Sequence, residues 1–208
     1  MCGIIGYCGH RPAVPVILEG LRRLEYRGYD SSGVAFLQGG ELVLVKAKGK
    51  LLNLENKLAA QNAYLATSGM GHTRWATHGL PTEKNAHPHT DAARSIALVH
   101  NGIIENYQEL KKELSAAGVR FASDTDTEVL AQLIGFLLKT AGSLAEAISQ
   151  ALARVEGAYA IVVTARDNPG MLYAARKSSP LVMGVGVGEN FLASDIPAFL
   201  PYTREVVF

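Results

Sequence analysis

Apolar residues along the chain follow helical spacing in some segments and form short runs in others, which predicts separate blocks of helix and strand. Turn residues such as Gly39-Gly40 and Gly28 mark the ends of these segments. The elements predicted for the first half are, in order, a strand at 2–8, a helix at 14–24, a hairpin of 33–37 and 41–46, a helix at 51–60, and strands at 69–74 and 96–100.

The second half continues with helices and then with strands. Two helices are expected to begin at capping boxes, Asn106 with Glu109 and Ser143 with Glu146, and residues 127–138 carry apolar side chains on one face between them. The last third predicts strands at 158–164, 171–175, 181–185 and 190–193. Because strands and helices come in blocks, we expect an α+β layered fold with mostly antiparallel sheets.

Composition narrows the class of protein. A chain of 208 residues suits one domain, since domains commonly hold about 100–200 residues. The net charge of +1 provides no basic surface field for nucleic acid or acidic lipid. No run approaches the ~20 apolar residues of a membrane span, and the start lacks the features of a secretory signal. We therefore expect a cytoplasmic protein with no nucleic-acid or membrane partner.

Cys2 is a candidate nucleophile. If Met1 is removed, Cys2 carries a thiol beside a free α-amine, whose ordinary pKa near ~8 allows it to take the thiol proton. The alternative is that Cys2 simply begins a buried strand. Cys8 lies an even number of residues away and faces the same side of the predicted strand, and we interpret it as a core thiol.

Asn101-Gly102 is a candidate pair of oxyanion donors for such a nucleophile. The Asn101 side-chain amide and a backbone N–H at Gly102, where no Cβ obstructs the approach, can both donate to a tetrahedral intermediate. The alternative is an Asn-Gly hairpin turn. In SDTDTEV, an aspartate can hold an ammonium, or Asp124 and Asp126 can serve only the N-terminus of the following helix.

The segment GHTRWATHG holds a further candidate site. Arg74, at the end of a predicted strand, can bind a carboxylate through two parallel hydrogen bonds, and Trp75, Thr77 and His78 would form an adaptable loop beside it. Arginine and tryptophan are also common on ordinary surfaces, so the segment alone leaves both interpretations open.

Metal and cofactor chemistry is not expected. Five histidines crowd the middle of the chain without the spacing of a zinc site and without a cysteine partner, and GVGVGEN lacks the glycine spacing of a dinucleotide-binding loop. These histidines are His72, His78, His87, His89 and His100.

Several motifs together resemble one protein family. MCGIIGY, LRRLEYRGYDSSG, GHTRWATHG, NAHPH, HNGIIENY and SDTDTEV, in this order, are similar to the glutaminase domain of class II glutamine amidotransferases. EYRGYDSSG, HTRWATHG and HNGIIENY most resemble the glutamine-fructose-6-phosphate aminotransferases, also called glucosamine-6-phosphate synthases. The resemblance runs from Cys2 to the end of the chain. It implies the four-layer αββα sandwich of the N-terminal-nucleophile hydrolases.

The resemblance also implies roles for individual residues. Cys2, freed of Met1, would attack the side-chain amide of L-glutamine and form a glutamyl thioester that water hydrolyses, with its own α-amine as base. Asn101 and Gly102 would form the oxyanion hole, Arg74 would bind the substrate α-carboxylate, and Asp126 the α-ammonium. A closed, dry site would keep the released ammonia from being protonated and lost.

Four further residues have implied supporting roles. Trp75, Thr77 and His78 would belong to a loop that closes over glutamine, and Trp75 would also gate the route taken by ammonia. Arg27 would hold the N-terminal segment in place.

The domain organisation follows from the same resemblance. Residues 1–208 would form one glutaminase domain, and the sugar isomerase domains, which would take fructose 6-phosphate in a homo-oligomeric full-length enzyme, are absent from this chain. Two alternatives stay open. One is the glutaminase domain of another class II enzyme, such as an amidophosphoribosyltransferase. The other is a non-catalytic module that binds glutamine through Arg74 and Asp126.

Overall fold

The computed structural model describes residues 2–28, 30–59, 65–75 and 80–208. The helices are α1 (Ala13–Leu24), α2 (Leu51–Ala59), α3 (Tyr107–Ala116), α4 (Asp126–Leu137) and α5 (Leu144–Leu152), with short 3-10 turns at Glu25–Arg27, Glu83–Asn85 and Ile196–Ala198. The strands are β1 (Gly3–Cys8), β2 (Ser31–Gln38), β3 (Glu41–Lys48), β4 (Ser68–Arg74), β5 (His89–Thr90), β6 (Ile96–Ile104), β7 (Gly157–Ala165), β8 (Tyr173–Lys177), β9 (Val182–Gly186), β10 (Glu189–Ala193) and β11 (Glu205–Val207).

The strands form two sheets. A seven-stranded sheet has the order β11-β9-β10-β1-β4-β2-β3, and a four-stranded sheet has the order β5-β6-β7-β8. Every neighbouring pair of these strands is antiparallel. β1 and β4 are central in the larger sheet, and β6 and β7 are central in the smaller one. Each of these strands is therefore hydrogen-bonded to a neighbour on both sides.

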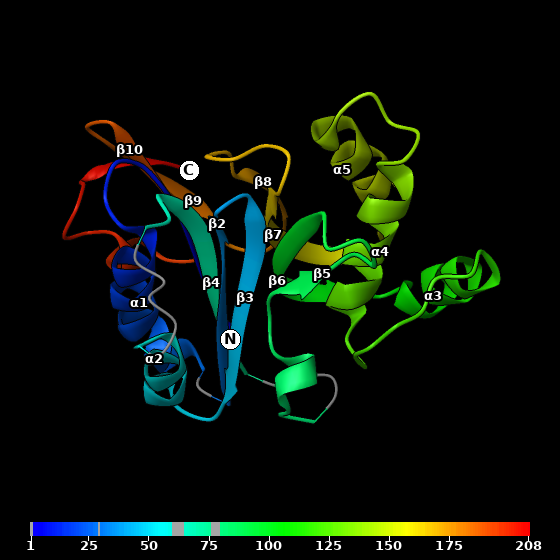
Figure 1. The fold of residues 1–208 in the computed structure, drawn as a ribbon, viewed down its shortest axis with the longest axis horizontal. Helices are drawn as coiled ribbons and strands as arrows, with labels where there is room; N and C mark the ends of the chain where they lie inside the picture. The colour runs from blue at the N-terminus through cyan, green and yellow to red at the C-terminus, as the bar shows by residue number, and fades with distance from the viewer. Residues whose placement is uncertain (1, 29, 60–64, 76–79) are drawn as a thin grey trace.

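Three apolar clusters define the layers. One joins the larger sheet to α1 and α2, a second joins the smaller sheet to α3, α4 and α5, and a third holds Ile4, Met70, Val99 and Val162 between the two sheets. Figure 1 shows α1 and α2 on one outer side and α4 and α5 on the other. The α+β class and the four-layer αββα arrangement that we predicted are therefore confirmed.

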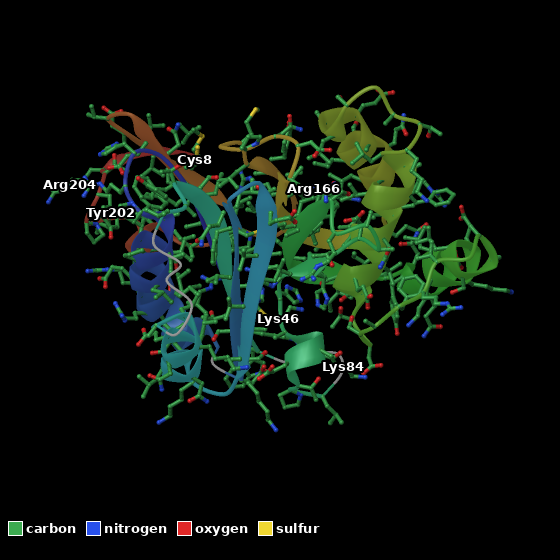
Figure 2. All side chains as sticks on the ribbon, in the orientation of Figure 1. Cys8, Lys46, Lys84, Arg166, Tyr202 and Arg204 are labelled. Atoms are coloured by element: carbon green, nitrogen blue, oxygen red, sulfur yellow. The ribbon has the colours of Figure 1, made fainter. Side chains whose placement is uncertain are left out.

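The two faces of β1 explain its sequence. Ile5 and Tyr7 point into the cluster under α1, whereas Ile4 points toward the second sheet, where Val162 would also meet a side chain added at Gly6. Cys8 is only half-buried at the end of the strand, where its thiol contacts the carbonyl oxygen of Gly170 at 2.7 Å. The prediction of a fully buried core thiol is thus wrong, and Figure 2 shows Cys8 at the upper edge of the molecule.

The predicted capping boxes have different outcomes. The hydroxyl of Ser143 accepts a hydrogen bond from the backbone N–H of Glu146 at 3.1 Å, as expected. The side chain of Asn106 makes no cap bond; instead, its amide donates to Arg154 O and its oxygen accepts from Glu156 N. The Asn106 box is wrong because those distant backbone groups take both polar atoms of the side chain.

None of the helices in the described ranges combines the length and apolar composition that a membrane crossing requires.

Candidate functional site

Cys2 lies directly before β1, at the edge where the neighbouring β4 ends in Arg74. Its sulfur accepts a hydrogen bond from the backbone N–H of Trp75 at 3.3 Å and lies 3.6 Å from the Trp75 carbonyl oxygen. Burial raises the pKa of the thiol above its ordinary value, although the Trp75 N–H and the nearby Arg74 charge act in the opposite direction. The thiol therefore stays protonated at neutral pH until a base removes its proton.

The carbonyl oxygen of Cys2 accepts hydrogen bonds from two side chains that are far apart in the sequence. Arg27 Nε and Asn101 Nδ2 each donate to it at 3.1 Å. Arg27 Nη1 lies 3.2 Å from the carboxylate of Asp195, which also accepts a hydrogen bond from Tyr26. The backbone at Cys2 is thus held by Asn101 and by Arg27, which is itself paired with Asp195 in the segment after β10.

Asn101 and Gly102 lie inside β6, opposite Ala160 and Tyr159 of β7. The hairpin-turn interpretation of this dipeptide is therefore wrong. Gly102 has φ +132°, and a Cβ built on it would lie 2.0 Å from the carbonyl oxygen of Ala158. Only glycine fits here without displacing β7.

A small cavity of about 30 Å³ is lined by Cys2 and by other residues that the sequence analysis named, among them Arg74, Gly102 and Asp126. Its volume is far below the ~300–1,000 Å³ of an ordinary small-molecule pocket. The residues that line the cavity are Cys2, Arg74, Trp75, His87, His100, Gly102, Thr125, Asp126 and Thr127.

Arg74 and Asp126 contribute opposite charges to this cavity. Arg74 is 4% exposed, and its Nη1 donates to the carbonyl oxygen of Leu80 at 3.4 Å. The Asp126 carboxylate accepts from the backbone N–H of Ile104 at 2.9 Å and from that of Thr127 at 3.0 Å. Both charged groups contact the backbone, and two opposite charges at one cavity suit a zwitterionic ligand.

Two of the predicted loop residues, Thr77 and His78, lie outside the described residues. Trp75 is described; its side chain is 53% exposed at the edge of the cavity. Asn101 is 7% exposed and does not line the cavity, although it contacts Cys2. The structure thus brings Cys2, Arg74, Trp75, Gly102 and Asp126 around one space, with Asn101 and Arg27 behind Cys2.

Four buried histidines pack at the cavity; His87 and His100 line it, whereas His72 and His89 do not. The rings of His72 and His87 stack with centroids 4.1 Å apart, and His89 meets His87 edge-on at 5.0 Å. His100 contacts the hydroxyl of Thr127 through Nδ1 at 2.9 Å. Burial lowers the pKa of all four, so each ring is neutral. Among the described residues, no group of three or more His, Cys, Asp or Glu side chains is arranged to hold a metal ion.

The sequence analysis missed Thr125 and Thr127 of the cavity lining, and it missed two contributors outside that lining, Asp195 and His72. Asp195 was not singled out because it lies 168 residues from Arg27 and has no motif around it. His72 was considered only as a metal ligand, although it sits two residues before Arg74 and therefore on the same face of β4. That spacing is the one signal that could have placed His72 near the site.

The chain is similar to several known proteins. A family model described as "Glutamine amidotransferase domain" matches residues 72–201. The chain is 54% identical over its whole length to the glutamine–fructose-6-phosphate aminotransferase (isomerizing) of Caldanaerobacter subterraneus subsp. tengcongensis. It is 56% identical to the enzyme of the same name from Pyrococcus horikoshii. It spans only 34% and 35% of the length of these two relatives.

Solved structures show the same fold. The glutamine phosphoribosylpyrophosphate amidotransferase of B. subtilis, solved with ADP and GMP, superposes with a TM-score of 0.81 at 29% identity. The match covers 97% of this chain and 44% of that one. Since the family model covers more than half of the sequence, the chain belongs to the glutamine amidotransferase domain family.

Proposed function

We propose that the chain, once Met1 has been removed, hydrolyses the side-chain amide of L-glutamine to glutamate and ammonia. The observation that carries the proposal is the arrangement around one cavity of the Cys2 thiol, the Gly102 backbone and the two charged groups of Arg74 and Asp126. The identity to aminotransferases that use glutamine, at 54–56%, supports the same substrate.

The chemistry begins with proton transfer. The free α-amine of Cys2 takes the thiol proton, and the sulfur attacks the carboxamide carbon, so a C–S bond forms and the oxygen becomes an oxyanion. Asn101 Nδ2 and the Gly102 N–H stabilise that charge. When the intermediate collapses, the C–N bond breaks and the amine returns its proton to the leaving ammonia. Water then attacks the thioester, which releases glutamate and restores the thiol.

Substrate binding uses the two charged ends of glutamine. The guanidinium of Arg74 binds the α-carboxylate and the carboxylate of Asp126 binds the α-ammonium, so the amide is presented to Cys2. Trp75, with Thr77 and His78, closes over the substrate, and Trp75 gates the exit of ammonia. Arg27 keeps Cys2 in position through its backbone oxygen. No cofactor enters any of these steps.

In a longer protein, further domains would use the ammonia that this domain releases. We infer that residues 1–208 are the glutaminase domain of a glutamine-fructose-6-phosphate aminotransferase, whose sugar isomerase domains use the ammonia to make glucosamine 6-phosphate. The relatives' names and the share of their length that this chain matches support this inference. A cytoplasmic location and a homo-oligomeric full-length enzyme remain predictions.

The test is a glutaminase assay on the chain lacking Met1. We expect stoichiometric glutamate and ammonia from glutamine, no product from Cys2→Ala, and a large rise in KM for Arg74→Ala. If the wild type binds glutamine as tightly as Cys2→Ala does and releases no glutamate, the chain is a binding module instead. Complementation of a strain that lacks the aminotransferase or the amidophosphoribosyltransferase, by the full-length gene, separates the two enzyme alternatives.

A further inference from the structure

His72 and Asn101 meet between the two sheets, one from β4 and the other from β6. His72 Nε2 lies 3.0 Å from Asn101 Oδ1 and 3.1 Å from the carbonyl oxygen of His100. The His72 ring is fully buried and Asn101 is nearly so. The contact is therefore shielded from water, where hydrogen bonds control geometry most strongly.

The hydrogen-bond partners of His72 determine its tautomer. The carbonyl oxygen of His100 can only accept, so Nε2 must carry the hydrogen. His72 Nδ1 then carries none, and it finds no hydrogen-bond partner among the described residues. Burial lowers the pKa of His72 to about 3, which keeps the ring in this neutral form.

The tautomer in turn determines which way the Asn101 amide points. Because Nε2–H donates, the amide atom that faces it must be the acceptor Oδ1, and Nδ2 must lie on the other side. On that side Nδ2 donates to Cys2 O at 3.1 Å, which is another group that only accepts. A reversed amide would set Nδ2 against Nε2–H and Oδ1 against Cys2 O, so both contacts would become repulsive. One of the two Nδ2 hydrogens is used by Cys2, which leaves the second for an oxyanion.

We propose that His72 is a positioning residue for the glutaminase reaction, because its Nε2–H holds Oδ1 of Asn101 and thereby keeps the Asn101 Nδ2 donor on the side of Cys2, where its second hydrogen can bind the oxyanion. The inference rests on the proposed glutaminase function. Neither His72 nor Asn101 lines the cavity, but Asn101 Nδ2 reaches Cys2 directly, whereas His72 reaches it only through Asn101.

Two amide substitutions at this position form a matched pair. In His72→Gln, the side-chain Nε2 stands the same number of bonds from Cα as the histidine Nε2, so it can still donate to Asn101. In His72→Asn, the amide nitrogen stops at the distance of Nδ1 and cannot reach. We expect His72→Asn to lower kcat for glutamine by about 10- to 100-fold, less than the ~100- to 1000-fold loss of an entire oxyanion donor. His72→Gln should recover most of that rate, and KM should change less than about twofold in both because Arg74 and Asp126 are untouched.

Two measurements distinguish positioning from a structural role. The rate of Cys2 alkylation by iodoacetamide, which forms no oxyanion, should be the same in His72→Asn and wild type. In an Asn101→Ala background, His72→Asn should lower kcat no further, since the two residues act as one unit. Independently of activity, ¹⁵N-histidine NMR should show His72 with its hydrogen on Nε2.

Each outcome has a definite meaning. If the wild type shows no glutaminase activity, the proposed function fails. If the wild type is active, the inference about His72 is overturned by a folded His72→Asn with normal kcat, by additive losses with Asn101→Ala, or by an Nδ1–H tautomer. A His72→Gln that is as impaired as His72→Asn contradicts it as well.

Discussion

Gly102→Ala is the perturbation whose cost follows most directly from the structure. The residue has φ +132°, and an added Cβ would lie 2.0 Å from Ala158 O and 3.0 Å from His100 Nε2. The backbone conformation costs a non-glycine residue about 1–3 kcal/mol, and forcing a methyl group into packed structure costs about 1–3 kcal/mol more. The free energy of unfolding should therefore fall by about 2–6 kcal/mol, from a total of ~5–15 kcal/mol.

Gly118→Ala is the matched control, because Gly118 also has positive φ, +86°, but no atom lies within 4 Å of the position that an added Cβ would take. It should lose only the conformational cost of about 1–2 kcal/mol. Urea unfolding measures both values. In the glutaminase assay, Gly102→Ala should lose at least ~100-fold in kcat because the oxyanion donor moves with the strand, whereas Gly118→Ala should keep the wild-type rate. Equal destabilisation of the two variants, or a fully active Gly102→Ala, would refute the reasoning.

Three further predictions concern charges and protons. Asp195→Asn should lower kcat only about two- to fivefold, since a partly exposed ion pair with Arg27 stabilises by ~0.2–1 kcal/mol; steady-state kinetics test this, and a loss above fiftyfold would contradict it. The free energy of unfolding should fall as pH drops below ~6.5, where histidines in the unfolded chain become protonated. In the folded chain the buried histidines stay neutral to a lower pH, and His72 has a pKa of about 3 there, so protonation favours the unfolded chain. For His72 alone this amounts to about 2–3 kcal/mol between pH 7 and 4.5, seen in urea unfolding at each pH, and His72→Gln should flatten the curve. In the chain that keeps Met1, alkylation of Cys2 should still accelerate with pH beyond 8 because burial raises its thiol pKa; a plateau below pH 8 would show a low-pKa thiol instead.

Local pattern was sufficient for most of the fold, whereas the roles expected of the polar site residues came from the resemblance to a family. Alternation and helical spacing predicted β2, β3, α1 and α4 to within a few residues, because each element's own side chains face the core. The Asn101-Gly102 turn was wrong because the pairing of β6 with β7 is decided by residues almost 60 positions away.

Side-chain partnerships across the chain were beyond the same reasoning. The sequence around Asn106 predicts a helix cap, but in the structure its side-chain amide bonds to the backbone of Arg154 and Glu156. Asp195 becomes relevant only when the fold brings it to Arg27, and His72 only when β4 and β6 face each other across the two sheets. Sequence patterns report periodicity, whereas these contacts depend on tertiary arrangement.

The central claim, that Cys2 is the nucleophile once Met1 is removed, is tested most directly by intact-mass spectrometry after exposure to 6-diazo-5-oxo-L-norleucine, an electrophilic analogue of glutamine. The account predicts a single adduct on the trimmed chain, mapped to Cys2, suppressed by excess glutamine and absent from Cys2→Ala. A trimmed, folded chain that takes up no label, or that is labelled on Cys8, would contradict it.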